Sequence, residues 1–206
     1  AVKEHPQNAS ESNKLVIDAF KQHFDKSKCV KESLRKFEDE FNNEEFLEGV
    51  NKIKHDGKNK PLIKLIFSDI GVEVFKETRS GFDKYSIEHY MPQEAQEKWN
   101  ISKDISRKHE NKLGNILIID ADINGKMQNK SHSDKIEILE NHTNNTALTK
   151  EFIKTNENKD SHYNFGKLTE DNLKDSNFEE NPSEIDKRTK ILANYIRRAY
   201  ITNFKY

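Results

Sequence analysis

The chain has 206 residues, which suits one compact domain with appendages, and only 33% of them are hydrophobic while 34% are charged. The formal net charge is −1, so no overall field attracts an anionic partner, and binding to nucleic acid would need a local basic patch. A single cysteine, Cys29, excludes an intramolecular disulfide and a cysteine-based zinc cluster.

The apolar runs exclude a membrane-spanning helix. The longest ones, such as "LIKLIF" and "ILII", are far too short to cross a bilayer, and no signal-peptide pattern opens the chain. We therefore expect a cytoplasmic protein without a membrane partner. The first residue is Ala rather than Met, which fits a processed chain or a piece of a longer one.

The N-terminal third predicts helices. Residues 1–10 predict a flexible lead-in, and residues 11–60 predict a helical segment that either links to a missing domain or belongs to this one. After the loop "HDGKNK", Pro61 is a favourable first-turn residue for a helix over 62–76. We expect the main domain to span residues 61–206.

The middle of the chain predicts two strands and a helix. A β-like stretch over 85–90 is closed by Pro92, and the apolar run after Gly114 predicts a second strand. The letters "ADING" over 121–125 predict a turn, and residues 126–139 predict one helix. The fold class is therefore α+β and mostly helical.

The C-terminal part predicts one well-defined helix. Residues 141–181 are polar and predict an irregular or partly helical connection. In "NPSEIDKR", Ser183 with Asp186 three residues later is a capping-box pattern. Ile185, Leu192 and Ile196, with Tyr200 as a further candidate, predict a buried stripe along the helix that follows.

A carboxylate and an imidazole, Glu88 and His89, stand at the end of the first predicted strand. Adjacent strand residues point to opposite faces, so the two share one site only where the strand has ended and bends. If the two strands form a hairpin that the helix covers, Asn115 and Asn124 converge on the same place. From the residues alone, a surface pair at Glu88–His89, a strand-entry turn at Asn115 and a plain turn at Asn124 remain alternatives.

The ordered series "IEHYMPQ", "KLGNILII", "NKSHSDK" and "IDKRTKILA" resembles the C-terminal nuclease domain of GmrSD-type restriction endonucleases. The specific part of the series is His89 with Pro92, then residues 113–115 and Asn124. Such domains belong to the HNH class, also called ββα-metal or His-Me finger. The resemblance implies a ββα-metal hairpin-plus-helix core surrounded by helices. In "NKSHSDK", His132 stands where relatives commonly have an aromatic core residue.

The resemblance also implies roles for individual residues. His89 would be the general base that deprotonates water, Glu88 and Asn124 would bind the metal, and Asn115 would hold the loop that carries the base. Because Glu and Asn offer only hard oxygen ligands, Mg²⁺ or Mn²⁺ fits better than zinc. One such ion would stabilise the scissile phosphate and the leaving oxygen.

Basic residues near these positions are candidate contacts to phosphate or DNA. They lie on both sides of the second strand, and ordinary solvated side chains are the alternative reading. The candidates are His109, Lys112, Lys126 and Lys130.

These observations predict an HNH-type, metal-dependent endonuclease that nicks or cuts DNA, with modified DNA as an open alternative. By resemblance it would be the effector domain of a restriction or antiviral defence protein whose N-terminal ParB-like domain binds nucleotide. Two alternatives remain. The domain is an RNA or structure-specific nuclease of the same fold, or an inactive module for DNA binding or protein docking.

Overall fold

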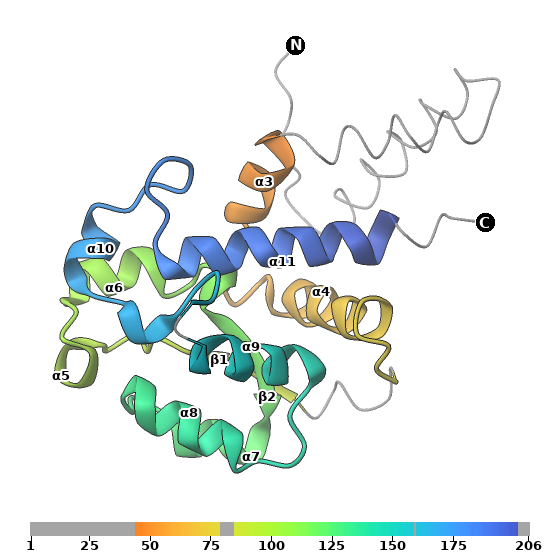
Figure 1. The fold of residues 1–206 in the computed structure, drawn as a ribbon, viewed down its shortest axis with the longest axis horizontal. Helices are drawn as coiled ribbons and strands as arrows, with labels where there is room; N and C mark the ends of the chain where they lie inside the picture. Colours follow the sequence, from red (N-terminus) through yellow and green to blue (C-terminus); the bar gives the residue numbers. More distant parts are fainter. Residues whose placement is uncertain (1–43, 79–84, 159, 202–206) are drawn as a thin grey trace.

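A computed structural model describes residues 44–78, 85–158 and 160–201. The predictions for residues 1–10 and for most of 11–60 therefore lie outside the described residues, as does Cys29. Helices surround a small central sheet, and α11 runs along one side of it (Figure 1). Within the described ranges, no helix has the length and apolar character that crossing a bilayer requires.

The described elements alternate between short helices and the two strands of one sheet. In chain order they are α3 (Glu44–Asn51), α4 (Lys60–Glu73), β1 (Tyr85–His89), α5 (Gln96–Trp99), α6 (Lys103–His109), the 3₁₀ helix η2 (Leu113–Asn115), β2 (Ile116–Asp120), α7 (Ala121–Met127), α8 (His132–Glu140), α9 (Ala147–Glu157), the 3₁₀ helix η3 (Phe165–Lys167), α10 (Glu170–Lys174) and α11 (Glu184–Ile201). The mostly helical α+β class is confirmed.

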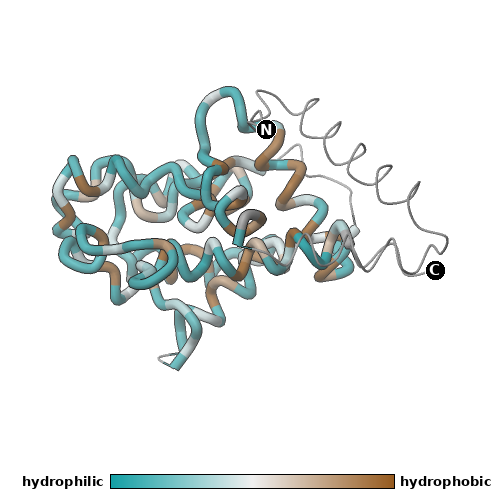
Figure 2. Tube along the Cα trace, turned by 90° about the horizontal axis from the view of Figure 1, so that it is seen from above, coloured by the Kyte–Doolittle hydropathy of each residue, from teal (hydrophilic) through white to brown (hydrophobic). Residues whose placement is uncertain are grey.

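Strands β1 and β2 form an antiparallel hairpin in which His89 lies opposite Ile116 and Tyr85 lies opposite Asp120. The apolar residues of β2 are buried on both faces of the sheet. Leu117 belongs to a hydrophobic cluster with residues of α7, α8 and α9, whereas Ile116 belongs to a second cluster with residues of α4 and α11. Figure 2 shows short hydrophobic stretches that alternate with hydrophilic ones along the described part of the trace.

The C-terminal predictions are confirmed except at Tyr200, whose side chain is exposed near the end of α11 rather than buried. The Ser183 hydroxyl accepts a hydrogen bond from the Asp186 backbone N–H at 3.3 Å, and the Asp186 carboxylate accepts one from the Ser183 N–H at 3.2 Å. Ile185 and Leu192 are buried on α11, as is Ile196. Residues 141–181 are partly helical, as expected.

The region after β2 differs from its prediction. Residues 121–125 are the first turns of α7 rather than a turn, because the Asp120 carboxylate caps this helix by accepting from the Asp122 N–H at 3.1 Å. A single helix over 126–139 is also wrong. Gln128 has a φ of 35°, which interrupts the helix, and the Ser131 hydroxyl then caps α8.

The end of the segment 11–60 packs onto the rest of the domain. Val50 of α3 is buried in the same cluster as residues of α4 and α11. Lys54 then forms an antiparallel β-bridge with Lys112, next to η2. Whether the preceding residues link to another domain stays a prediction.

Candidate active site

His89, the last residue of β1, is half-buried between two side chains that come from different parts of the chain. Its Nε2 lies 3.0 Å from the Asn111 Oδ1 and 3.2 Å from the His55 Nδ1. The two imidazole rings meet edge to face, with their centroids 4.9 Å apart. His55 comes from the loop between α3 and α4, so the site extends beyond the hairpin.

These contacts determine which nitrogen of His89 is free. The Asn111 amide nitrogen donates to the Glu110 Oε1 at 3.3 Å, so its Oδ1 faces His89 as an acceptor. This orientation assigns the proton to the His89 Nε2, with the His55 Nδ1 unprotonated beside it, and leaves the His89 Nδ1 as an unprotonated nitrogen. Burial lowers the pKa of His89, and the hydrogen bond to Asn111 opposes that shift. A neutral imidazole of this kind can accept a proton near neutral pH.

Asn115 is completely buried and fixes the chain that leaves β1. Its Oδ1 accepts from the Met91 N–H at 2.8 Å, while its amide nitrogen donates to the Met91 and Glu110 carbonyl oxygens, both at 2.8 Å. One side chain therefore joins the segment after His89 to the segment before η2. Whether this contact serves to hold the loop of a catalytic base, as the resemblance implies for Asn115, stays a prediction.

Helix α11 fixes η2 from the other side. The buried Arg188 donates to the carbonyl oxygens of Gly114 and Ile116 at 2.6 and 2.8 Å. The Thr189 hydroxyl accepts from the Gly114 N–H at 3.1 Å. A Cβ atom at position 114 would lie 2.0 Å from the Ile185 carbonyl oxygen, so only glycine permits this approach.

Glu88 lies on the opposite face of β1 from His89. Its Oε1 is 2.6 Å from the Lys135 Nζ, and both side chains are buried. Lys135 also donates to the His89 carbonyl oxygen at 3.3 Å. Burial raises the pKa of Glu88 and lowers the pKa of Lys135, and the attraction between the two charges opposes both shifts. β1 thus includes both residues of the pair, and their side chains do not meet.

Asn124 approaches β1 from α7. Its amide nitrogen donates to the Ile87 carbonyl oxygen at 3.4 Å, which leaves its Oδ1 available to other groups. Asn124 of α7 therefore contacts β1 at the residue directly before Glu88.

These two residues are also the candidate metal ligands. In the described part of the chain, no group of three or more His, Cys, Asp or Glu side chains is placed to hold a metal ion. A site built on Glu88 and Asn124 would supply two oxygen ligands and keep several waters, which suits Mg²⁺. The donors fit such an ion, although Lys135 already occupies one oxygen of Glu88.

The four candidate phosphate contacts are not equivalent. His109 is buried on α6, and burial lowers its pKa to about 4, so this structure does not present it to a phosphate. Lys112 forms an ion pair with Asp186 at 2.7 Å. Lys126 and Lys130 are exposed at and after the end of α7. The two exposed lysines are the better placed of the four.

His132 packs as an aromatic residue. Its Nδ1 lies 3.0 Å from the Tyr90 hydroxyl, and its ring meets Tyr90 and Trp99 at centroid distances of 5.8 and 6.1 Å. Burial lowers the pKa of His132, which favours the neutral ring. At the start of α8, His132 thus packs against aromatic rings in the position where relatives commonly have an aromatic core residue.

Sequence reasoning missed His55, Asn111 and Lys135 as neighbours of the site. His55 stands in a polar loop 34 residues before His89, and no spacing rule connects the two. Lys135 resembles any other lysine of a charged helix. Asn111 gave the nearest signal, since it precedes the "LGN" stretch in the loop between the strands.

Comparison with known proteins gives one match. A family model described as "GmrSD restriction endonucleases, C-terminal domain" matches residues 5–195. No curated protein and no solved structure matches the chain. The matched range includes the hairpin, α7 and α8, and most of α11.

Proposed function

Because the chain belongs to the family of GmrSD restriction endonuclease C-terminal domains, we propose that it is a metal-dependent nuclease of the HNH class that hydrolyses DNA phosphodiester bonds. The observation that carries this proposal is the Asn111–His89 contact of 3.0 Å, which leaves the His89 Nδ1 free to accept a proton. The hairpin followed directly by α7 supports a ββα-metal core.

His89 performs the proton transfer in this mechanism. Its Nδ1 takes a proton from the attacking water, and Asn111 stabilises the imidazolium that forms by accepting from Nε2. General-base catalysis of this kind contributes about 10²–10⁴-fold to the rate. Asn115 positions His89 because it fixes Met91, two residues further along the chain.

Glu88 and Asn124 would hold the divalent ion, Mg²⁺ or Mn²⁺, which supplies Lewis-acid stabilisation of the phosphate and of the leaving oxygen. Lys135 already places one positive charge at Glu88, so it would have to share or yield the carboxylate. Exposed Lys126 and Lys130 would contact backbone phosphates on either side.

A plasmid assay tests this function. Supercoiled DNA is incubated with the protein in Mg²⁺ or Mn²⁺, and EDTA, His89→Ala and His162→Ala are the controls. Nicking should require the metal and His89, and it should survive the change at the exposed His162. Nicking that persists both in EDTA and in His89→Ala would refute the mechanism. RNA and branched DNA substrates in the same assay separate the nuclease alternatives.

A DNA-binding module without activity is the second candidate. The observation that favours it is the 2.6 Å ion pair between Lys135 and Glu88, because it neutralises a metal ligand. Binding without cleavage in every metal would support this alternative. The assay is repeated with the ParB-like domain added, since in the proposed restriction and antiviral role that domain would regulate cleavage from elsewhere in a longer protein.

A further inference from the structure

An open cavity of about 420 Å³ lies beside the loops that carry the candidate active site. Its size is within the range of small-molecule sites. All of its lining side chains are polar and comprise two amides, two carboxylates and two cations: Gln93, Asn129, Glu94, Glu110, Lys103 and Arg107. Such a lining suits a ligand that carries both a negative charge and hydrogen-bond donors.

Glu110 is the lining residue that most needs a ligand. It is only 9% exposed, and its Oε2 has no hydrogen-bond partner. A buried acceptor without a partner costs about 1–3 kcal/mol, so each such atom calls for an explanation. Burial raises the pKa of Glu110, while the charge of Arg107 lowers it. A donor from a bound ligand would satisfy Oε2.

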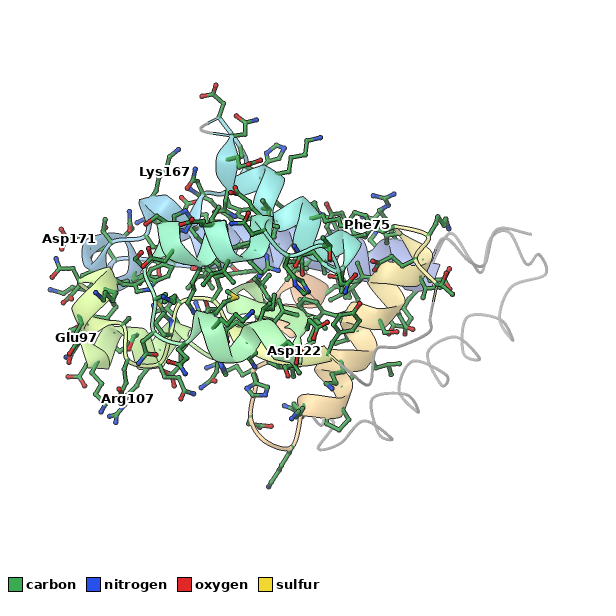
Figure 3. All side chains as sticks on the ribbon, turned by 90° about the horizontal axis from the view of Figure 1, so that it is seen from below. Phe75, Glu97, Arg107, Asp122, Lys167 and Asp171 are labelled. Atoms are coloured by element: carbon green, nitrogen blue, oxygen red, sulfur yellow. The ribbon has the colours of Figure 1, made fainter. Side chains whose placement is uncertain are left out.

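Lys103 and Arg107 supply the positive side of the cavity. They are four residues apart on α6, so they lie on one face of the helix. Both are exposed, and neither forms an ion pair within 4.0 Å with any other described residue. Figure 3 shows the Arg107 side chain extending outward from the ribbon. Two adjacent free cations suit a phosphate group.

The cavity is connected to His89 by two side chains. The Glu110 Oε1 accepts from the Asn111 amide at 3.3 Å, and the Asn111 Oδ1 lies 3.0 Å from the His89 Nε2. Asn115 holds the Glu110 and Met91 backbones together, each at 2.8 Å. The position of Glu110 in the cavity wall and the orientation of His89 therefore depend on the same contacts.

We propose that this cavity binds one nucleotide of the substrate strand, with a backbone phosphate on Lys103 and Arg107 and the exocyclic amino group of cytosine or adenine on the Glu110 Oε2. Carboxylates accept from the cytosine amino group in known complexes, and amides pair with adenine. Gln93 and Asn129 provide such amides. Thymine has no exocyclic amino group and offers only its ring N3–H, so it cannot make this contact with Oε2. This inference rests on the proposed nuclease function.

Fluorescence anisotropy with the full chain in EDTA tests the base preference. The probes are short labelled single strands rich in dC, dA or dT, so binding is measured without cleavage. The wild type should bind dC and dA strands about tenfold more tightly than dT strands, the size of one good base contact. Glu110→Gln keeps the side-chain shape but replaces the Oε2 acceptor with a donor, so it should remove the preference. Equal binding of all strands by the wild type, or an unchanged preference in Glu110→Gln, would overturn the base contact.

The phosphate contact is tested with the same probes. Lys103→Ala and Arg107→Ala should each weaken binding to every strand, and should each lower the salt dependence by about 0.7 in log–log slope. Lys98→Ala, which removes an exposed lysine outside the cavity, is the matched control. If the cavity variants behave like Lys98→Ala, the phosphate contact is wrong.

The two proposals fail in different ways. Base preference that depends on Glu110, combined with no cleavage of plasmid, supports the nucleotide site and refutes the nuclease. Metal-dependent cleavage that requires His89, combined with unchanged binding in the cavity variants, refutes the nucleotide site alone. Circular dichroism of each variant confirms that it is folded.

Discussion

Glu88 and His89 are adjacent in β1, and their side chains lie on opposite faces of the strand in different environments. Glu88 is buried against α8, where its carboxylate pairs with Lys135 at 2.6 Å, whereas His89 stays half-exposed between two neutral groups. A buried ion pair makes the fold sensitive to losing either charge, while a half-exposed imidazole leaves the fold nearly unaffected when it changes. We therefore expect changes on the Glu88 face to lower stability as well as to affect metal binding, and changes at His89 to affect the chemistry with little effect on stability.

The largest effect is expected at Lys135. Lys135→Met leaves Glu88 buried without its counter-charge and should lower the free energy of unfolding by about 3–5 kcal/mol. Urea denaturation measures this loss. Glu88→Gln combined with Lys135→Met should recover most of it, because no unpaired charge then remains. A double variant as unstable as Lys135→Met would contradict the comparison.

The matched control for this experiment is Lys52→Met. Lys52 forms an ion pair with Glu48 at 3.3 Å in which both side chains are largely exposed. Exposed pairs contribute little to stability, so this variant should unfold close to the wild type.

The second largest effect is expected at Asn115, which lies between the two regions. Asn115→Ala removes three hydrogen bonds of 2.8 Å and should lower the free energy of unfolding by about 2–4 kcal/mol. Below its melting temperature the folded variant should also cleave more slowly, because His89 loses its fixed position. Thermal melting and cleavage rates measure the two effects, and a variant that melts like the wild type would remove Asn115 as the loop clamp.

A third prediction concerns the pH dependence of stability that the buried His109 should cause. Burial lowers the pKa of His109 from 6.5 to about 4. Between these values the unfolded state binds more protons, so stability is complete above pH 6.5 and falls as the pH decreases toward 4. The slope reaches about 1.4 kcal/mol per pH unit. In His109→Gln the decrease should be shallower, as urea titrations at several pH values would show; identical pH profiles would contradict this assignment.

The smallest effect on stability is expected at His55. His55→Ala removes one half-exposed contact of 3.2 Å and should lower the free energy of unfolding by less than about 1 kcal/mol. Its cleavage rate should fall nonetheless, since His89 loses a neighbour that restricts its ring. A loss of stability comparable to that of Lys135→Met would mean that the two faces do not differ in the way proposed.

Local chemistry made part of this molecule predictable. The capping box at Ser183, the strand after Gly114 and the end of β1 before Pro92 each depend on neighbouring residues, and the structure has all three. The start of α7 was missed because "ADING" also fits a turn. The break at Gln128 was missed because nothing in the sequence indicates a positive φ at that residue.

The contacts that define the site could not be predicted in the same way. His55 and Lys135 reach β1 from segments 34 and 47 residues away, and such pairs depend on how the helices pack. The burial of His109 has the same origin, because α6 packs against α10 only in the folded domain. The resemblance to a family supplied roles for Glu88, His89, Asn115 and Asn124 that the residues alone left open.

The contacts of Arg188 impose an order on how this site is made. During synthesis β1 and η2 leave the ribosome before α11, and domains generally fold as units once their parts are present. Until α11 has been made, the Arg188 guanidinium cannot donate to the carbonyl oxygens of Gly114 and Ile116. A nascent chain that ends before α11 therefore contains the residues of the hairpin and η2 but lacks these two hydrogen bonds. The backbone geometry of η2 is therefore completed only when the last described helix has been made.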